Sequence, residues 1–331
     1  MTPANPSVFA EIAPFRIEPR FVPRVWGSVD LRPWYPCGPL SEPVGEVWLT
    51  GDDCQVATGP HSGKRLADLF QEAQEAMLGS ASAEQTSPLL IKVIFAREKL
   101  SVQVHPDDQL AQKYGHPRGK TECWYALAAD PGAQVAVGLR PGVKFDQVKA
   151  AVRDGTMERL LSVLPISAGE MISVEAGTVH AIWPGSILLE TQQNCDLTYR
   201  LYDYGRPREL QIEKSLEATR LATRAGKVKA QNTQDRTILL DGEYFCIERI
   251  PVNVSRSSHT LPGKSELTRG LSYLFAASGS ARLSSAGFEA LELPARGIIA
   301  VPAKSPIFAI QDLGGLDLIR ISPRWPAGMA L

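Results

Sequence analysis

Short runs in which apolar and polar residues alternate fill the chain from residue 46 to residue 205. Alternation with a period of two is typical of strands that bury one face. Because glycine and proline break these runs at close intervals, the pattern favours a β-sandwich or barrel over βαβ units. The expected strands are residues 46–51, 89–104, 122–127, 171–174, 186–193 and 197–205.

Three segments show helical spacing instead: residues 63–78, residues 144–165 with a break at Gly155, and residues 208–223. A polar stretch from 224 to 237 is typical of a linker, and a second all-β pattern follows it. The sequence therefore predicts a first β domain with helical segments, and then a second β domain. Their expected bounds are residues 1–230 and 237–331.

The segment LSVQVHPDD, residues 100–108, has an unusual strand pattern. One side carries two valines, and the other carries Ser101, Gln103 and His105. Consecutive polar groups on one face must be solvated, hydrogen-bonded or bound to a ligand. We expect the valines to pack into a core between layers, and the polar side chains to line a pocket.

Composition restricts the functions that such a fold could serve. With 35 basic and 36 acidic residues the net charge is −1, so nothing indicates nucleic acid or an anionic membrane as a partner. No apolar run approaches the length of a membrane helix, and the N-terminus does not have the pattern of a signal peptide. The five cysteines are scattered without a CxxC motif, which favours a reducing cytoplasm. Any metal would then be held by His, Glu, Asp or Gln side chains rather than by cysteine.

The segment GEMISVEAGTVHAI, residues 169–182, resembles the metal-binding turn of cupin barrels. A strand would lead into a sharp turn at Gly177, and the returning strand would present His180 to the barrel interior. Cupins usually place a proline where this chain has Glu175. The resemblance places His180 beside the QVH segment.

Four side chains from these segments could hold one metal ion. Gln103 and His105 lie two residues apart and face the same side of a strand. Glu122 begins another strand, and His180 follows the turn. Two imidazoles, a carboxylate and an amide oxygen suit zinc, although iron or manganese would also accept them.

Two further polar positions fall on strands near this expected site. Glu190 shares a strand face with Leu188 and Gln192, and Arg200 lies on the next strand. One interpretation is a structural Glu–Arg pair inside a barrel, which would destabilise the fold unless its charges were well satisfied. The other is a polar pocket.

Cations near the expected metal would suit a phosphate group, because arginine binds phosphate through paired, charge-assisted hydrogen bonds. Lys120, Arg200 and Arg206 supply these cations. The sequence contains neither a GxxxxGK[ST] loop nor a GxGxxG motif, so a nucleotide phosphate is not indicated.

Four ordered segments resemble type I mannose-6-phosphate isomerases in their short bacterial form: PLLIKVIFAREKLSVQVHPDD, GKTECWYAL, AGTVHAI and LETQQNCDLTYRLYDYGR. The RVWG and GEVWLTG segments are also similar to this family, and the resemblance is clear over roughly residues 15–230. It implies a zinc enzyme on a cupin fold that interconverts mannose 6-phosphate and fructose 6-phosphate.

The resemblance also implies roles for individual residues. The metal positions of the family match Gln103, His105, Glu122 and His180, with Gln103 as the weaker ligand. The expected catalytic residues are Arg200, Glu190 and Lys120, and the expected substrate-binding residues are Ser101 and Arg206.

The isomerisation moves a proton between carbon 1 and carbon 2 through an enediol, so it needs a general base and a cation beside the developing oxyanion. Glu190 is the first choice for the base, with His180 and Lys120 as alternatives. Arg200 would stabilise the enediolate or bind phosphate.

The C-terminal region has a weaker cupin pattern. Gly297 and Pro302 have the spacing of the cupin turn, but Phe308 stands near the position where a metal-binding histidine would be. We therefore expect a metal-free barrel that serves structure, with a regulatory sugar site as the alternative. The predicted architecture is a mainly β bicupin of two jelly-roll barrels, with helical insertions in the first.

Two other functions are compatible with these patterns. One is a non-catalytic metal bicupin that binds sugars or sugar phosphates, and the other is a different metal cupin enzyme such as an oxygenase. Glu190 and Arg200 beside four metal-type ligands favour catalysis, and an oxygenase would usually show an HxH pair. We expect one zinc ion per chain, a small sugar phosphate as the partner, and a monomer or weak oligomer.

Overall fold

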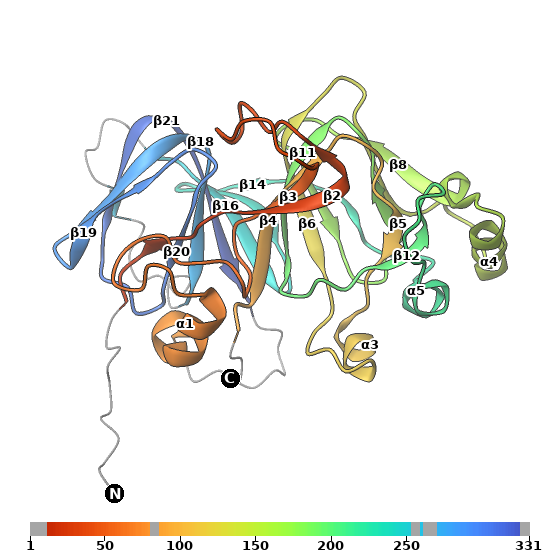
Figure 1. The fold of residues 1–331 in the computed structure, drawn as a ribbon, viewed down its shortest axis with the longest axis horizontal. Coiled ribbons are helices and arrows are strands. Elements are labelled where there is room, and N and C mark those ends of the chain that lie inside the picture. The colour runs from red at the N-terminus through yellow and green to blue at the C-terminus, as the bar shows by residue number, and fades with distance from the viewer. Residues whose placement is uncertain (1–11, 80–85, 253–258, 261–269, 325–331) are drawn as a thin grey trace, which may run out of the picture. The chain divides into compact units, whose positions relative to one another are not determined.

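The computed structural model describes the parts of the chain between residues 12 and 324 that are coloured in Figure 1. They are residues 12–79, 86–252, 259–260 and 270–324. Among these residues, no helix is both long enough and apolar enough to cross a membrane.

Contacts within the chain define two compact units. The central unit consists of Arg20–Trp48 and Leu89–Lys229, and the flanking unit consists of Met1–Pro19, Leu49–Pro88 and Ala230–Leu331. The predicted domain bounds, residues 1–230 and 237–331, stay a prediction. By contacts within the chain, Met1–Pro19 and Leu49–Pro88 group with Ala230–Leu331.

Two antiparallel sheets build the central unit. The seven-stranded sheet has the order β13 (Gly226–Val228), β9 (Met171–Val174), β6 (Glu122–Ala129), β11 (Ser186–Gln193), β4 (Leu89–Ala96), β3 (Val44–Trp48) and β2 (Arg20–Ser28). The five-stranded sheet has the order β12 (Tyr199–Tyr202), β5 (Val102–Val104), β10 (His180–Ile182), β7 (Gln134–Leu139) and β8 (Leu161–Pro165).

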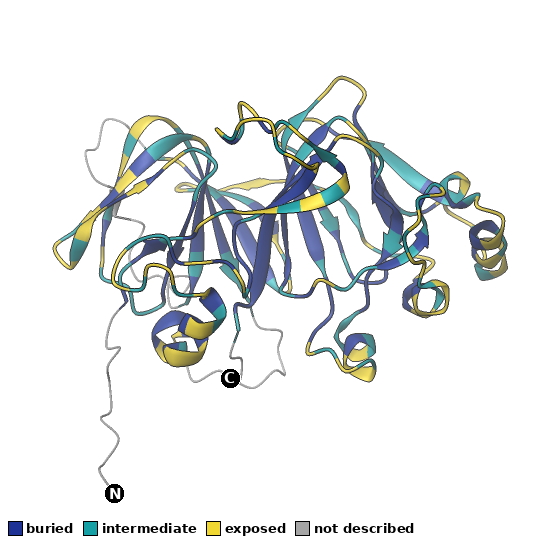
Figure 2. Cartoon of the chain, viewed as in Figure 1, coloured by how far each residue is buried: buried dark blue, intermediate teal, exposed yellow. Residues whose placement is uncertain are grey.

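The core of the central unit draws residues from both sheets. Trp124 and Leu188 of the seven-stranded sheet pack in one buried cluster with Val135 and Ile182 of the five-stranded sheet. Burial of each large apolar side chain contributes about 1.5–3 kcal/mol. The two sheets therefore enclose a buried interior. In Figure 2 the strands around it are mostly dark blue, the colour of buried residues.

Helices cover the other face of the five-stranded sheet. The residues Val102 and Val104 pack in a second buried cluster with Val148 and Ala218. The helical elements that contribute to this cluster are α4 (Phe145–Arg153), η1 (Met157–Leu160) and α5 (Ile212–Ala218). The two valines thus face away from the polar side chains of their own strand, as predicted.

The flanking unit contains a nine-stranded antiparallel sheet. Its main order is β1 (Phe15–Arg16), β20 (Ile298–Val301), β18 (Ser272–Ser285), β21 (Ala309–Pro323), β16 (Phe245–Ile250), β15 (Thr237–Asp241) and β14 (Gln231–Asn232). β17 (His259–Thr260) pairs with β21, and β19 (Phe288–Leu293) pairs with β18. An apolar cluster that includes Leu274, Ile299 and Leu318 forms its core.

The mainly β prediction is confirmed, and β9 and β11 have the predicted bounds. The expected strand at residues 89–104 is wrong in one respect: it contains β4 and β5, which enter different sheets. The expected linker at 224–237 contains β13, β14 and the first residue of β15.

The predicted helices are shorter in the structure. The segment 63–78 forms α1 (Leu66–Glu72) and α2 (Gln74–Leu78), and both lie in the flanking unit rather than in the first domain. The helix α3 (Asp108–Lys113) was not predicted. It begins where the Asp107 carboxylate accepts a hydrogen bond from the backbone N–H of Leu110, an N-cap that the sequence PDD contains.

Candidate active site

Three of the four expected metal ligands converge inside the central unit. Ligand atoms of His105, Glu122 and His180 lie within 4.8 Å of one another, and all three side chains are buried. Strand pairing brings them together, because His180 on β10 lies opposite Gln103 on β5, and His105 follows β5. Glu122 begins β6 in the other sheet.

Backbone carbonyl groups fix the orientation of both imidazoles. His105 Nδ1 lies 2.8 Å from the carbonyl oxygen of Leu197, and His180 Nδ1 lies 2.9 Å from that of Thr178. A carbonyl oxygen only accepts, so each Nδ1 carries the proton and each Nε2 presents its lone pair to the interior of the group. These Nε2 atoms lie 3.3 Å and 3.4 Å from the two oxygens of Glu122.

The protonation states suit a metal site. Burial and the neighbouring Lys120 lower the pKa of His105 to about 3, and burial also lowers the pKa of His180. Burial alone would raise the pKa of Glu122, but Lys120 and the two imidazoles hold that pKa well below its usual range. The group therefore offers two neutral nitrogens and one carboxylate.

An incompletely paired carboxylate supports the fit to a cation. Among the described residues Glu122 Oε1 has no hydrogen-bond partner, although it is buried and faces the lone pair of His180. The Lys120 ammonium lies 2.5 Å from Glu122 Oε2 and 2.9 Å from His105 Nε2. Buried acceptors that face one another need a positive charge between them, and nitrogen with carboxylate oxygen is a donor set of zinc.

Gln103 is close to this group, but its amide nitrogen, rather than its oxygen, faces the histidine. Its Nε2 lies 3.1 Å from His180 Nε2, while its Oε1 accepts a hydrogen bond of 3.2 Å from Ser101. The oxygen and nitrogen of the amide would have to exchange places before the oxygen faced the metal position. Ser101 is buried beside it, so both polar residues of this strand face the interior as predicted.

A cavity of about 740 Å³ lies beside the buried group within the central unit. This volume is in the range of small-molecule sites. Five of the residues expected at the site line it: Ser101, Gln103, Lys120, Glu190 and Arg200. Further charged or aromatic lining residues were not predicted, among them Arg24, Trp26, Glu46, Lys92, Arg208 and Lys214.

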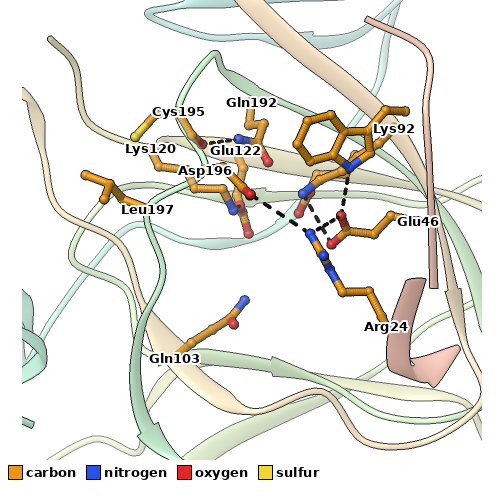
Figure 3. A network of polar contacts seen from close by, with 12 residues as sticks. Arg24, Glu46, Lys92, Gln103, Lys120, Glu122, Gln192, Cys195, Asp196 and Leu197 are labelled. Atoms are coloured by element: carbon orange, nitrogen blue, oxygen red, sulfur yellow. Dashed lines mark hydrogen bonds and ion pairs between the residues drawn. The ribbon is translucent and has the colours of Figure 1, made fainter. Parts of the chain in front are cut away.

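A chain of charges crosses four neighbouring strands on the cavity wall. Lys92 Nζ on β4 lies 2.8 Å from Glu190 on β11 and 3.5 Å from Glu46 on β3. Arg24 on β2 lies 2.9 Å from the other oxygen of Glu46. Figure 3 shows Arg24, Glu46 and Lys92 meeting at their charged ends. The partner of Glu190 is thus Lys92, so the Glu–Arg pair considered from the sequence is wrong.

Two tryptophans complete the hydrogen bonding of these carboxylates. Trp124 Nε1 donates to Glu190 at 3.1 Å, and Trp48 Nε1 donates to Glu46 at 2.8 Å. Burial and the charge of Glu122 raise the pKa of Glu190. Lys92 and Arg24 outweigh burial at Glu46 and lower its pKa to about 2.

Arg200 on β12 pairs with Gln103 on β5 and faces the same interior. Its Nε is buried and has no hydrogen-bond partner among the described residues. Burial and the nearby Arg208 lower the pKa of Arg200. Arg206, in contrast, is absent from the cavity lining; its guanidinium binds Asp203 and the carbonyl of Lys99.

A lysine inside a fully buried strand was a signal that the sequence did contain. The segment LLIKVIFA places Lys92 among apolar residues, and such a charge needs a buried partner. Glu46 in VGEVW gives the same signal, since it lies in a strand whose neighbours are apolar.

Comparisons with known proteins point to one family. Residues 15–137 match the model of the type I phosphomannose isomerase catalytic domain. A mannose-6-phosphate isomerase of Streptococcus mutans is 32% identical over 280 residues, which cover 78% of this chain and 88% of that protein.

Solved structures show the same fold. The mannose 6-phosphate isomerase of Bacillus subtilis has a TM-score of 0.82 at 29% identity, with 94% of this chain and 99% of that chain covered. A mannose 6-phosphate isomerase bound with zinc and yttrium has a TM-score of 0.74 at 17% identity, with coverage of 95% and 100%. Because sequence identity near one third extends over more than three quarters of the chain, this protein belongs to the type I phosphomannose isomerase family.

Proposed function

We propose that this chain is a zinc-dependent aldose–ketose isomerase that interconverts mannose 6-phosphate and fructose 6-phosphate through an enediol. One observation carries this proposal: a buried His–Glu–His group adjoins a cavity that contains both a buried carboxylate and an arginine with unused donors. The S. mutans relative, named as a mannose-6-phosphate isomerase, supports the choice of substrate.

His105, Glu122 and His180 would hold one zinc ion, and Gln103 would be a fourth ligand if its amide oxygen turned inward. The zinc in a solved relative of the same fold supports the choice of metal. When bound, zinc supplies Lewis acidity toward the oxygens of the sugar.

Glu190 is the proposed general base. Its side chain lines the cavity, and burial raises its pKa, which makes the carboxylate a stronger base than a solvated one. Lys92 and Trp124 hold the carboxylate in place while leaving lone pairs for a substrate proton. Glu190 would remove the proton from carbon 2 of mannose 6-phosphate and return it to carbon 1.

Arg200 and Lys120 are the proposed cationic groups. Arg200 would stabilise the enediolate or bind the phosphate, because its buried Nε has no hydrogen-bond partner among the described residues. Lys120 lines the cavity and contacts Glu122, so it is the alternative acid–base group.

The remaining features of the proposal rest on composition. All five cysteines are free thiols, which fits a reducing cytoplasm. The proposed partner is the sugar phosphate alone, without nucleic acid or membrane, and the proposed state is a monomer or weak oligomer.

A coupled assay tests the function. Purified full-length protein is incubated with mannose 6-phosphate, and fructose 6-phosphate is measured before chelation, after chelation and after zinc is returned. We expect turnover that chelation removes and zinc restores. Binding of mannose 6-phosphate without turnover by the zinc-loaded protein would favour the non-catalytic bicupin instead.

A further inference from the structure

The turn after β12 brings two arginines to one buried carboxylate. Tyr204 and Gly205 have φ of 56° and 78°, and the Arg206 N–H donates to the Asp203 carbonyl at 3.0 Å. Two consecutive residues with positive φ give a tight, primed turn. A non-glycine residue such as Tyr204 adopts this conformation at an energetic cost, so the surrounding structure must hold the turn in place.

Asp203 is the centre of this arrangement. Its side chain is 2% exposed and accepts hydrogen bonds from both guanidinium groups. Arg206 Nη2 donates to Oδ1 at 2.8 Å. Arg208 donates through Nε to Oδ2 and through Nη2 to Oδ1, both at 2.6 Å. Such bidentate contact fixes the plane of the Arg208 guanidinium.

The two arginines differ in which of their N–H donors have hydrogen-bond partners. Arg206 Nη2 also donates to the carbonyl of Lys99 at 2.7 Å, and Arg206 Nη1 lies 3.9 Å from Glu98. Arg208 uses only Nε and Nη2, and within the described chain its Nη1 makes no hydrogen bond. Arg208 lines the cavity, whereas Arg206 does not. The first arginine is thus an anchor, and the second has a donor left for a ligand.

Arg208 also lies near Arg200. Each lines the cavity, and the charge of Arg208 disfavours protonation of Arg200. Gln211 ties the two segments together, because its N–H donates to the Arg200 carbonyl and its side chain accepts from the Arg200 N–H, both at 3.1 Å. Two arginines with unused donors at one cavity wall are a site for an anion with several oxygens.

The charges at this wall fit a phosphate monoester. Asp203 neutralises one of its two arginines, and Arg200 adds a second uncompensated positive charge. Lys214, which also lines the cavity, has its ammonium over the ring of Tyr114 at 4.5 Å. Glu42, Asp196 and Glu209 are the exposed acids of the cavity lining. A phosphate monoester carries about −1.5 to −2 charges at neutral pH.

We propose that Asp203 is a positioning residue that holds Arg208, and not Arg206, against the phosphate of the substrate together with Arg200. This inference rests on the proposed function for the identity of the phosphate's sugar. It replaces Arg206, the candidate from the sequence, with its neighbour two residues later.

Three substitutions in the full-length, zinc-loaded protein test the proposal: Arg208→Gln, Arg206→Gln and Asp203→Asn. Calorimetry measures binding of inorganic phosphate and of mannose 6-phosphate, and the coupled assay measures KM and kcat. Arg208→Gln should weaken phosphate binding about tenfold or more and raise KM more than it lowers kcat. Arg206→Gln should change phosphate affinity less than about threefold.

Asp203→Asn separates positioning from simple charge. Removal of a negative charge beside an anion site should strengthen phosphate binding if only the net charge matters. We expect about tenfold weaker binding instead, because the amide NH2 in place of Oδ2 cannot accept from Arg208 Nε, and the bidentate contact that fixes this guanidinium is lost. Asp203→Glu, which keeps the carboxylate, should restore part of the affinity.

Tighter phosphate binding by Asp203→Asn, or equal losses in Arg206→Gln and Arg208→Gln, would overturn the proposal. If Asp203→Asn does not fold, the comparison of Arg206→Gln with Arg208→Gln decides, because both arginines are partly exposed. Phosphate binding needs no turnover, so a wild-type protein that binds phosphate through Arg208 but forms no fructose 6-phosphate would contradict only the proposed function.

Discussion

Each unit of the molecule buries glutamate in its sheets, and Glu248 of the flanking unit and Glu122 of the central unit differ in their partners. In the flanking unit, Glu248 accepts from Arg320 at 2.7 Å through one oxygen and from Arg236 at 3.0 Å through the other. In the central unit, Glu122 contacts Lys120 through one oxygen and leaves the other without a hydrogen bond among the described residues.

This difference distinguishes a structural carboxylate from a ligand-binding one. A buried charge with both oxygens paired needs nothing further, since its desolvation is already offset. A buried carboxylate oxygen that has no hydrogen bond and faces an imidazole nitrogen, as Glu122 Oε1 faces His180 Nε2, is costly unless a cation joins it. The central unit therefore holds the site, and the expectation that the flanking barrel serves structure stays a prediction.

The largest expected effect is the loss of metal from the central glutamate. Glu122→Gln keeps the shape of the side chain but removes the charge that holds the ion. Loss of a group that only supports a metal ligand lowers metal affinity about 10- to 100-fold. Loss of the ligand itself should therefore lower metal affinity more than about 100-fold. Metal content and isomerase activity check this, with the thermal midpoint as the control for folding. A Glu122→Gln variant that keeps both its metal and its isomerase activity would show that Glu122 and Glu248 do not differ in the way proposed.

The next effect concerns Glu190, which is buried and paired like Glu248 but lines the cavity. Glu190→Gln should lower kcat about 10²- to 10⁴-fold, because a positioned general base contributes that much. Metal content should not change. Exchange of the carbon 2 proton with solvent deuterium is the direct measurement, and exchange at the wild-type rate would exclude Glu190 as the base.

Glu248→Ala tests the structural side of the comparison. Breaking a buried pair destabilises a protein by about 3–5 kcal/mol, because the remaining charge stays buried. Urea unfolding should show this loss in the flanking unit. The matched control, Glu248→Met with Arg320→Leu, should recover most of the stability, because apolar residues of similar size often replace such pairs without loss. No recovery would indicate a role for these charges beyond stability.

The smallest expected effect is a pH dependence from Glu46. Its folded-state pKa of about 2 lies below the unfolded value of 4.5. The folded state binds this proton less tightly than the unfolded state does. The stabilisation is therefore complete above pH 4.5 and is lost as the pH falls toward 2, by about 3 kcal/mol at most. Glu46→Gln should flatten the stability curve between these pH values. An unchanged slope would assign the acid sensitivity to other carboxylates.

Local patterns in the sequence were sufficient for some of the strands, among them β9 and β11, and for three residues that meet in the candidate metal site. The alternation in LSVQVHPDD predicted that the valines pack into a core between layers and that Gln103 faces the interior, because side chains of a strand alternate between its faces. The histidines and Glu122 were found because their residue types and strand contexts suit a metal.

What the sequence missed depends on which strands lie side by side. Period two says which face a residue occupies, but not which strand is its neighbour. Lys92 and Glu46 were therefore overlooked as partners of Glu190, since β3, β4 and β11 are adjacent only through long-range pairing. Helix propensity likewise could not show that α1 and α2 belong to the flanking unit.

The sequence alone determined the mainly β class, the family and the residues of the His–Glu–His group. Only the tertiary structure decided between Arg206 and Arg208, which are two residues apart and have the same chemistry. A tight turn and one buried carboxylate direct the first arginine to the backbone of Lys99 and leave the second at the cavity. The direction of each side chain depends on the residues that it contacts in the folded protein, and a local sequence pattern does not show which residues these are.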